Sequence, residues 1–170
     1  MNKPSKPPVE SPEQRDSDLV QVVDRTALIE NILNQIIVGY CAPRKEAWEF
    51  MWSVVLDTSV MSLGSKIKVA MAAAHEMRFK LNKDALHRVI SLRNAFAHHA
   101  SNAHPVLVVG REPEDDSSHL QLWVLESSGK ITKMKREEAL TEFNKVYKAA
   151  KESIVELKNA IHAKYEQSAA

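Results

Sequence analysis

A heptad pattern near the C-terminus is the strongest constraint on the fold of this chain. Apolar or small side chains recur there at alternating steps of three and four: Leu140, Phe143, Tyr147, Ala150, Ile154, Leu157 and Ile161. This spacing predicts one long helix with a single apolar seam. The seam packs either on a bundle within the same chain or on a second subunit as a coiled coil, and three heptads are too few to require the coiled coil.

Two helices are predicted in the first third of the chain. From about residue 18, side chains suited to a core recur every three or four positions: Leu19, Val22, Thr26, Ile29, Leu33, Ile36 and Tyr40. Gly39 and Pro43 mark the end of this helix. A second helix is predicted from Arg44 to about Leu56. Because its sequence, EAWEFMWSVVL, is rich in large apolar groups, we expect it to be central to the core.

The middle of the chain predicts two more helices and then strands. Residues 57–64 are predicted to form a loop, Ser65 to cap a third helix, and Asn82 to cap a fourth, KDALHRVISLRNAFAH. The runs PVLVVG, HLQLWVLE and KITKMK are short and β-branched or alternating, which predicts an antiparallel β insertion at about 105–135. The predicted fold class is mainly all-α: a helical bundle of about five helices with this insertion before the long last helix.

The composition is that of one soluble domain. The chain has 170 residues, 44% hydrophobic and 26% charged, with a net charge of +1. With so little net charge and no basic recognition helix, DNA binding is not expected. Cys41 is the only cysteine, which fits a reducing cytoplasm, and no apolar run approaches the roughly 18–20 residues of a membrane span.

The two ends of the chain are predicted to be disordered. Residues 1–17 hold four of the seven prolines and few bulky apolar groups, so they cannot bury enough surface to offset their ordering entropy. They also lack the apolar stretch of a secretory signal. The predicted domain therefore covers 18–166, with a further short disordered end at 167–170.

The stretch SLRNAFAHHA, residues 91–100, carries the candidate chemistry. On an ideal helix this segment has an apolar stripe, formed by Ala85, Val89, Leu92 and Phe96. A separate polar line is formed by His87, Ser91, Asn94 and His98. Arg93 falls inside the apolar arc, where a charged group is costly unless it is paired or reaches a wet cleft. Either Arg93 extends past its neighbours to water or to a structural carboxylate, or it holds an anion such as phosphate.

The two histidines also have two interpretations. His98 and His99 lie in the last turn of the helix, where histidines interact favourably with its negative end. Asn94 and His98 are one turn apart and can bind a common ligand. Arg93 and His98 are about 140° apart on an ideal helix, so they converge only if the helix ends near His98 or if the cleft lies between two subunits.

No metal or cofactor site is predicted. His98, His99 and His104 are the best candidates for metal ligands, but no acidic or cysteine ligand accompanies them at a helical or hairpin spacing. No glycine-rich phosphate loop is present either. Lys66 and Lys68 are candidates for substrate binding through added positive charge near the cleft; the alternative is a solvated face.

The motif on the fourth helix resembles that of a known superfamily. Arg93-Asn94-Ala95-Phe96-Ala97-His98 matches R-N-x-x-x-H, the R-x4-6-H motif of the HEPN superfamily of helical-bundle proteins. Upstream, SLGSKIKVAMAA (62–73) followed by ALHRVISLRNAFAHH (85–99) resembles the mannitol operon repressor branch of that superfamily and its uncharacterised relatives. In organisation the resemblance covers roughly residues 19–165.

The resemblance implies a metal-independent endoribonuclease that works as a homodimer, with the motifs of two subunits facing each other across a cleft. Arg93 would bind the scissile phosphate and stabilise its developing charge. Asn94 would orient a phosphate oxygen or His98, and His98 would act as a general acid or base. His99 also fits the spacing of the motif. Many such proteins are toxins or antiviral effectors.

Three functions therefore compete. The first is a dimeric ribonuclease or toxin with RNA as its substrate and an antitoxin as a partner. The second is a non-catalytic regulator that acts through protein–protein contacts, like the mannitol operon repressor. The third is a plain helical domain in which RNAFAHH is only the end of a helix.

Overall fold

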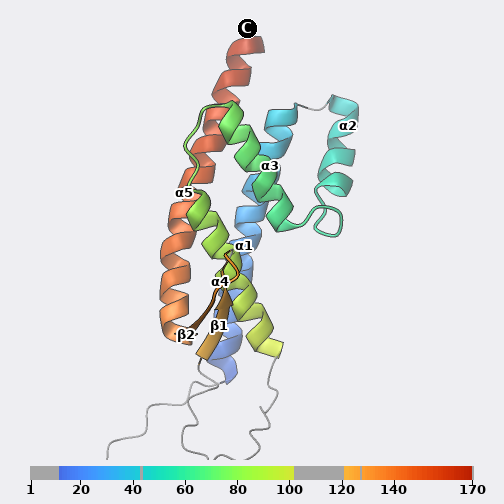
Figure 1. Cartoon of the computed structure of the whole chain (residues 1–170). Coiled ribbons are helices and arrows are strands. Elements are labelled where there is room, and N and C mark those ends of the chain that lie inside the picture. Colours follow the sequence, from blue (N-terminus) through green and yellow to red (C-terminus); the bar gives the residue numbers. More distant parts are fainter. Residues whose placement is uncertain (1–11, 43, 102–120, 127, 170) are drawn as a thin grey trace, which may run out of the picture.

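A computed structural model describes residues 12–42, 44–101, 121–126 and 128–169 (Figure 1). Within these ranges the elements are α1 (Pro12–Cys41), α2 (Lys45–Phe50), a π-helix η1 (Met51–Val55), α3 (Leu63–Glu76), α4 (Lys83–Ser101), β1 (Gln121–Leu125), β2 (Ile131–Lys135) and α5 (Arg136–Ala169). The structure is mainly helical, with a small antiparallel sheet before the long C-terminal helix. The predicted fold class is confirmed.

The core lies between four of the helices. α1 and α5 run side by side along the length of the molecule; α4 packs against both of them, and α3 packs mainly against α1 (Figure 1). The largest fully buried apolar side chains of the bundle are Ile29, Leu33 and Ile36 of α1, Ile67 of α3, Leu86, Leu92 and Phe96 of α4, and Phe143, Ile154 and Leu157 of α5. α4 is thus fixed by the core on one side along most of its length.

The heptad seam of α5 is satisfied within the chain. Phe143, Ala150, Ile154, Leu157 and Ile161 are buried in the bundle, and Leu140 and Tyr147 are partly buried against it. A seam that is already covered by α1 and α4 is not free for a coiled coil. The bundle alternative for this helix is therefore the correct one.

The β insertion is a two-stranded hairpin within the described residues. Its register pairs Gln121 with Lys135 and Leu125 with Ile131. Leu122 and Val124 are buried against the bundle, whereas Trp123 and Leu125 point away from it and are exposed. The predicted strands around β1 and β2 are confirmed, and the third candidate, at 105–110, lies outside the described residues.

The second helix is where the prediction was wrong. It was expected at the centre of the core, but neither α2 nor η1 contains a buried residue. The four long helices fill the core without it, so this segment lies beside the bundle (Figure 1). The other differences are at helix ends: α1 begins at Pro12, inside the predicted N-terminal tail, and α5 continues to Ala169.

Of the two predicted N-caps, Asn82 of α4 is confirmed and Ser65 of α3 is wrong. α3 begins at Leu63, so its N-cap is Ser62 rather than Ser65, and the Ser62 hydroxyl accepts a hydrogen bond from the Ser65 amide. α4 begins directly after Asn82, as predicted. The Asn82 side-chain oxygen accepts from the Ala85 amide at 3.2 Å.

We expect Asn82→Ala to lower the free energy of unfolding by about 1 kcal/mol, because it removes this cap. The Asn82 backbone amide donates to the Ser153 hydroxyl at 2.9 Å, and this bond survives the change. Asn82→Asp keeps a side-chain acceptor and is the matched control. Urea unfolding measures both variants, and equal losses would show that the side-chain cap contributes nothing.

Candidate functional site

The predicted site lies in the second half of α4, which the core holds firmly. Phe96, inside the motif, is completely buried. Arg136, at the start of α5, places its guanidinium 5.0 Å from the centre of the Phe96 ring. The same guanidinium donates to Asp18 of α1 at 3.1 Å, and both side chains of this ion pair are buried. Three helices thus meet at Phe96.

Sequence reasoning missed the support that Arg136 and Asp18 give to the motif. They lie 118 positions apart, so no local spacing relates them. Asp18 precedes the first apolar position of its helix, and Arg136 follows an alternating strand; both positions are typical of solvated charges. Only the tertiary structure shows that these two charged side chains are buried.

Arg93 occupies the position that the helical wheel predicted. It lies on the same arc of α4 as Val89 and Leu86, and its side chain is partly buried. One guanidinium nitrogen donates to the Asn94 side-chain oxygen at 3.2 Å. Among the described residues no carboxylate pairs with Arg93.

Three other buried or partly buried cations of the bundle do have carboxylate partners. Arg88, also on α4, donates to both oxygens of Glu142 at 2.6 and 2.9 Å, and these hydrogen bonds raise the pKa of Arg88. Arg136 pairs with Asp18, and Lys66 pairs with Glu30. Arg25 has instead an amide, Asn144, and the face of the Tyr147 ring. Arg93 therefore belongs with Arg25 to the partly buried arginines that have a neutral neighbour and no carboxylate among the described residues, and it is the one of the two that lies in the motif.

The polar residues of the motif face solvent in part. Asn94 is partly buried, and His98, one turn further on, is exposed. The backbone of His99 is helical, but its side chain lies outside the described residues. Both histidines therefore stay candidates for the acid–base role.

The course of α4 decides how Arg93 and His98 are related. The helix continues to Ser101 and does not end near His98. Five helical residues turn through about 500°, which leaves the two side chains about 140° apart around the axis. The first of the two arrangements expected from the sequence, a helix that ends near His98, is therefore wrong.

A shallow hollow borders the polar line of α4. Its volume is about 290 Å³, and its lining comes from α4 and the turn after β1: Asp84, His87, Arg88, Ser91 and Glu126. The Arg88 guanidinium in it is already engaged by Glu142, and lies 3.8 Å from Glu126. Since Arg93, Asn94 and His98 are not part of its lining, this hollow is separate from the predicted site.

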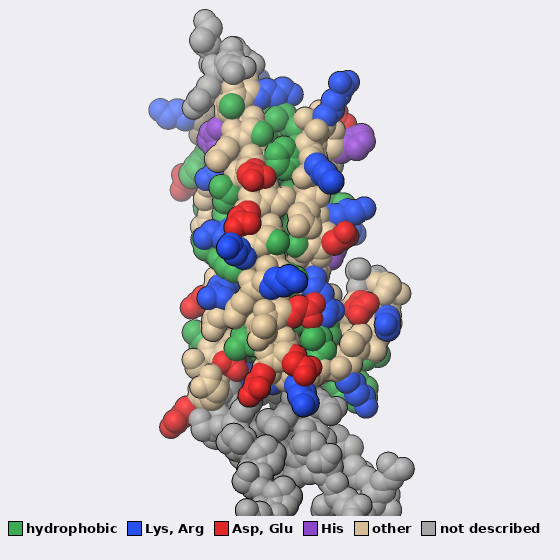
Figure 2. Space-filling view, turned by 90° about the vertical axis from the view of Figure 1, so that its left-hand side faces the viewer, with side chains coloured by type: hydrophobic (Ala, Val, Ile, Leu, Met, Phe, Trp, Pro, Cys, Tyr) green, Lys and Arg blue, Asp and Glu red, His purple; other side chains and the backbone are tan. Residues whose placement is uncertain are grey.

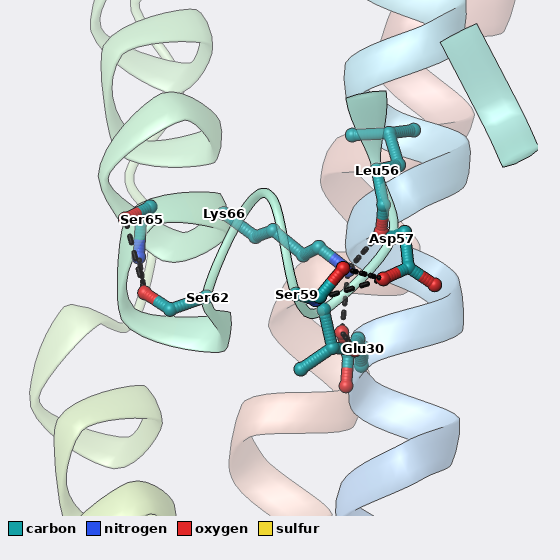
Figure 3. Close-up of polar contacts among 8 residues, drawn as sticks. Glu30, Leu56, Asp57, Ser59, Ser62, Ser65 and Lys66 are labelled. Atoms are coloured by element: carbon teal, nitrogen blue, oxygen red, sulfur yellow. Dashed lines mark hydrogen bonds and ion pairs between the residues drawn. The ribbon is translucent and has the colours of Figure 1, made fainter. Parts of the chain in front are cut away.

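The structure places the two candidate lysines very differently, and Figure 3 shows the polar contacts around Lys66. Lys66 is 1% exposed, and its ammonium donates to Glu30 of α1 and, at 2.5 Å, to the carbonyl of Leu56. The expectation of a solvated face is therefore wrong for Lys66, whose hydrogen bonds are made inside the fold. Lys68 is exposed on α3. Its predicted role in substrate binding stays a prediction.

The surface charge along α5 is mixed. Figure 2 shows this face, where Lys and Arg side chains alternate with Asp and Glu without an extended basic area. A second shallow hollow on α5 is lined mainly by acidic side chains, including Glu137, Glu138 and Glu142. A nucleic acid would have to bind elsewhere, because phosphate contacts need a surplus of positive charge.

Two further properties of the described residues bear on function. They contain no group of three or more histidine, cysteine or acidic side chains arranged to hold a metal ion. No described helix is both long enough and apolar enough to cross a membrane. When the chain was compared with family models, curated proteins and solved structures, no match was found.

Proposed function

We propose that this chain is a HEPN-like, metal-independent endoribonuclease whose site is completed by a second copy. The observation that carries the proposal is Arg93, a partly buried guanidinium with a neutral amide as its neighbour and no carboxylate among the described residues. A cation kept free of carboxylates on a rigid helix is suited to hold a phosphate, which offers two oxygens to the guanidinium fork.

The chemistry assigns one role to each polar side chain of the motif. Arg93 binds the scissile phosphate and stabilises the charge that develops on it. The ribose 2′-oxygen attacks phosphorus, the bond to the 5′-oxygen breaks, and a 2′,3′-cyclic phosphate and a free 5′-hydroxyl result. One histidine takes the 2′-hydroxyl proton and another gives a proton to the leaving oxygen; free imidazole, with a pKa near 6.5, can do either.

A second copy supplies what one α4 helix lacks. Arg93 and His98 of one chain point in directions about 140° apart, so a single chain cannot direct both at one phosphate. Two antiparallel α4 ends that face each other would place Arg93 of one chain opposite His98 of the other. The pair would also provide the two histidines that the acid and base steps need.

Purified wild-type protein is expected to cut RNA in the presence of EDTA and to leave cyclic-phosphate ends. His98→Ala is expected to abolish the cleavage. If His99→Ala abolishes it instead, His99 is the histidine that acts. Far-UV circular dichroism checks that each variant is folded. Intact RNA with wild-type protein at high concentration would contradict the proposal and would favour the non-catalytic regulator, which has the same fold.

A further inference from the structure

The outer face of the β hairpin carries aromatic, apolar and basic side chains together. Successive side chains of a strand point to opposite faces, so every second residue of each strand lies on this outer face. Five of these residues, called the platform below, are Trp123 and Leu125 of β1 and Ile131, Lys133 and Lys135 of β2. The three apolar members are each more than half exposed. The platform is therefore a surface that the bundle leaves open.

The lysines of the hairpin have no counter-charge among the described residues. Lys133 and Lys135 are exposed, and so is Lys130 in the turn. None of the three forms an ion pair with a described carboxylate. The carboxylate of the hairpin itself, Glu126, lies 3.8 Å from the Arg88 guanidinium of α4. Since the whole chain carries a net charge of only +1, three lysines within six positions are a local surplus of positive charge.

One ammonium is already held against the aromatic ring of the platform. The Lys133 ammonium lies 4.6 Å from the centre of the Trp123 ring, and the two residues are directly opposite each other in the register. Such a contact contributes only about 0.5–1 kcal/mol at an exposed site, so it orders the two side chains without locking them. A ring and an ammonium side by side match what one nucleotide offers, the face of a base and a phosphate.

One end of the platform lies beside the candidate motif of α4. β2 ends at Lys135, and the guanidinium of the next residue, Arg136, lies 5.0 Å from the centre of the Phe96 ring. The other end of the hairpin, at Glu126, lies beside Arg88, about two turns earlier on α4. The hairpin therefore runs along the second half of α4 (Figure 1). A chain bound along the platform reaches the motif at its Lys135 end.

We propose that the platform binds single-stranded RNA, with a base stacked on Trp123 and the flanking phosphates on Lys133 and Lys135. Each strand has five residues and is about 16 Å long, which gives room for two or three bases, as on other sheets that bind RNA through aromatic side chains. The identity of the strand as RNA rests on the proposed function. The binding surface does not, because none of its residues belongs to the α4 motif.

A single strand fits the platform better than other partners do. A protein that covered the apolar side chains would also cover the two ammoniums, which costs free energy unless it supplies carboxylates. A nucleic acid duplex supplies phosphates, but its bases are already paired and stacked on each other, so that Trp123 has none to bind. Only an unpaired strand offers exposed bases and phosphates at once.

Fluorescence anisotropy of a labelled oligouridine tests the platform. Its 2′-hydroxyls are methylated, so the chemistry proposed for α4 cannot cut it. Wild type is expected to bind with a dissociation constant on the order of 10 µM at low salt. Trp123→Ala should raise that constant about tenfold or more, because it removes the stacked ring, and Trp123→Phe should raise it less. Circular dichroism checks that each variant is folded.

Trp48→Ala is the matched control for the stacking residue. Trp48 is 47% exposed on α2, outside the hairpin, so its loss should leave the affinity for the methylated strand unchanged. If wild type does not bind the strand at low salt, the proposal is wrong. It is equally wrong if Trp123→Ala binds as tightly as wild type, or if Trp48→Ala weakens binding as much as Trp123→Ala does.

The salt dependence of binding tests the lysines. Each phosphate contact on a single strand contributes about 0.7 to the slope of log K against log salt concentration, so Lys133→Gln/Lys135→Gln should reduce that slope by about 1.4. Lys145→Gln/Lys148→Gln removes two exposed lysines of α5 and is the matched control, with an unchanged slope expected. If the hairpin variant keeps the wild-type slope, its lysines do not bind phosphate and the proposal fails.

Tryptophan emission tests the stacking itself. Trp48→Phe/Trp52→Phe leaves Trp123 as the only tryptophan, and the methylated strand should quench its emission. A duplex of the same length should not. Quenching by the duplex to the same extent, or binding of the strand without quenching, would overturn the proposal.

These measurements separate the platform from the chemistry proposed for α4. If wild type leaves unmodified RNA intact but binds the methylated strand through Trp123, the platform is confirmed and the cleavage proposal is wrong. If wild type cuts RNA and Trp123→Ala changes neither binding nor quenching by the strand, the platform is wrong and the cleavage proposal stands.

Discussion

Arg93→Ala is expected to lower the rate of metal-independent RNA cleavage by about 10³-fold, because it removes the one group proposed to stabilise charge on the phosphate. The expected loss is in kcat more than in KM, since that charge grows in the transition state. Arg93→Lys keeps the charge but loses the planar fork, and should lose about ten- to a hundredfold. Single-turnover cleavage of a short labelled RNA measures both variants.

Arg88→Ala is the matched control for this prediction. Arg88 lies on the same helix, is also partly buried, and is bound to Glu142 on both oxygens. Its loss should lower stability by about 1 kcal/mol, while the folded fraction cleaves RNA at the wild-type rate. If Arg88→Ala and Arg93→Ala reduce cleavage equally, the effect is one of fold stability, and the phosphate role of Arg93 is wrong.

The architecture could be predicted because each long helix carries its own periodicity. The α5 seam and the α1 pattern each indicate a buried face from the spacing of their side chains alone. The segment of α2 and η1 could not be placed in the same way. Its apolar content predicts burial, but neither helix contains a buried residue, because the four long helices already fill the core.

For the candidate site, the sequence predicts where a side chain lies on its helix better than it predicts which groups surround that side chain. Arg93 stands out on the wheel of α4 because a charge interrupts an apolar arc, and the structure finds it there. Whether such a charge meets a carboxylate depends on every neighbouring element, so the absence of one among the described residues was not predictable.

Lys66 carried a similar signal that was overlooked. It follows Leu63 by three positions and precedes Ala70 by four, which places it on the buried face of α3. The same argument that singled out Arg93 would have predicted a buried ammonium here. Its partner, Glu30, lies 36 positions earlier, and only the packing of α3 on α1 brings the two together.

Glu30→Leu is expected to lower the free energy of unfolding by about 3–5 kcal/mol, because it leaves the Lys66 ammonium buried without a counter-charge. Lys66→Met is expected to cost less, about 1–2 kcal/mol. It leaves Glu30, whose side chain is 20% exposed and still accepts from Thr58, in partial contact with water. The asymmetry follows from the exposure of the two partners, since the 1% exposed ammonium cannot reach solvent.

The double variant Glu30→Leu/Lys66→Met separates the charge effect from packing. With both charges gone, it should be more stable than Glu30→Leu alone by about 2 kcal/mol or more, which urea unfolding resolves. Thr58→Val is the control for the exposed side of the cluster, and should change stability by about 1 kcal/mol or less. If the double variant is as unstable as Glu30→Leu, the loss reflects poor packing of the new leucine. The ion pair would then not be what joins α3 to α1.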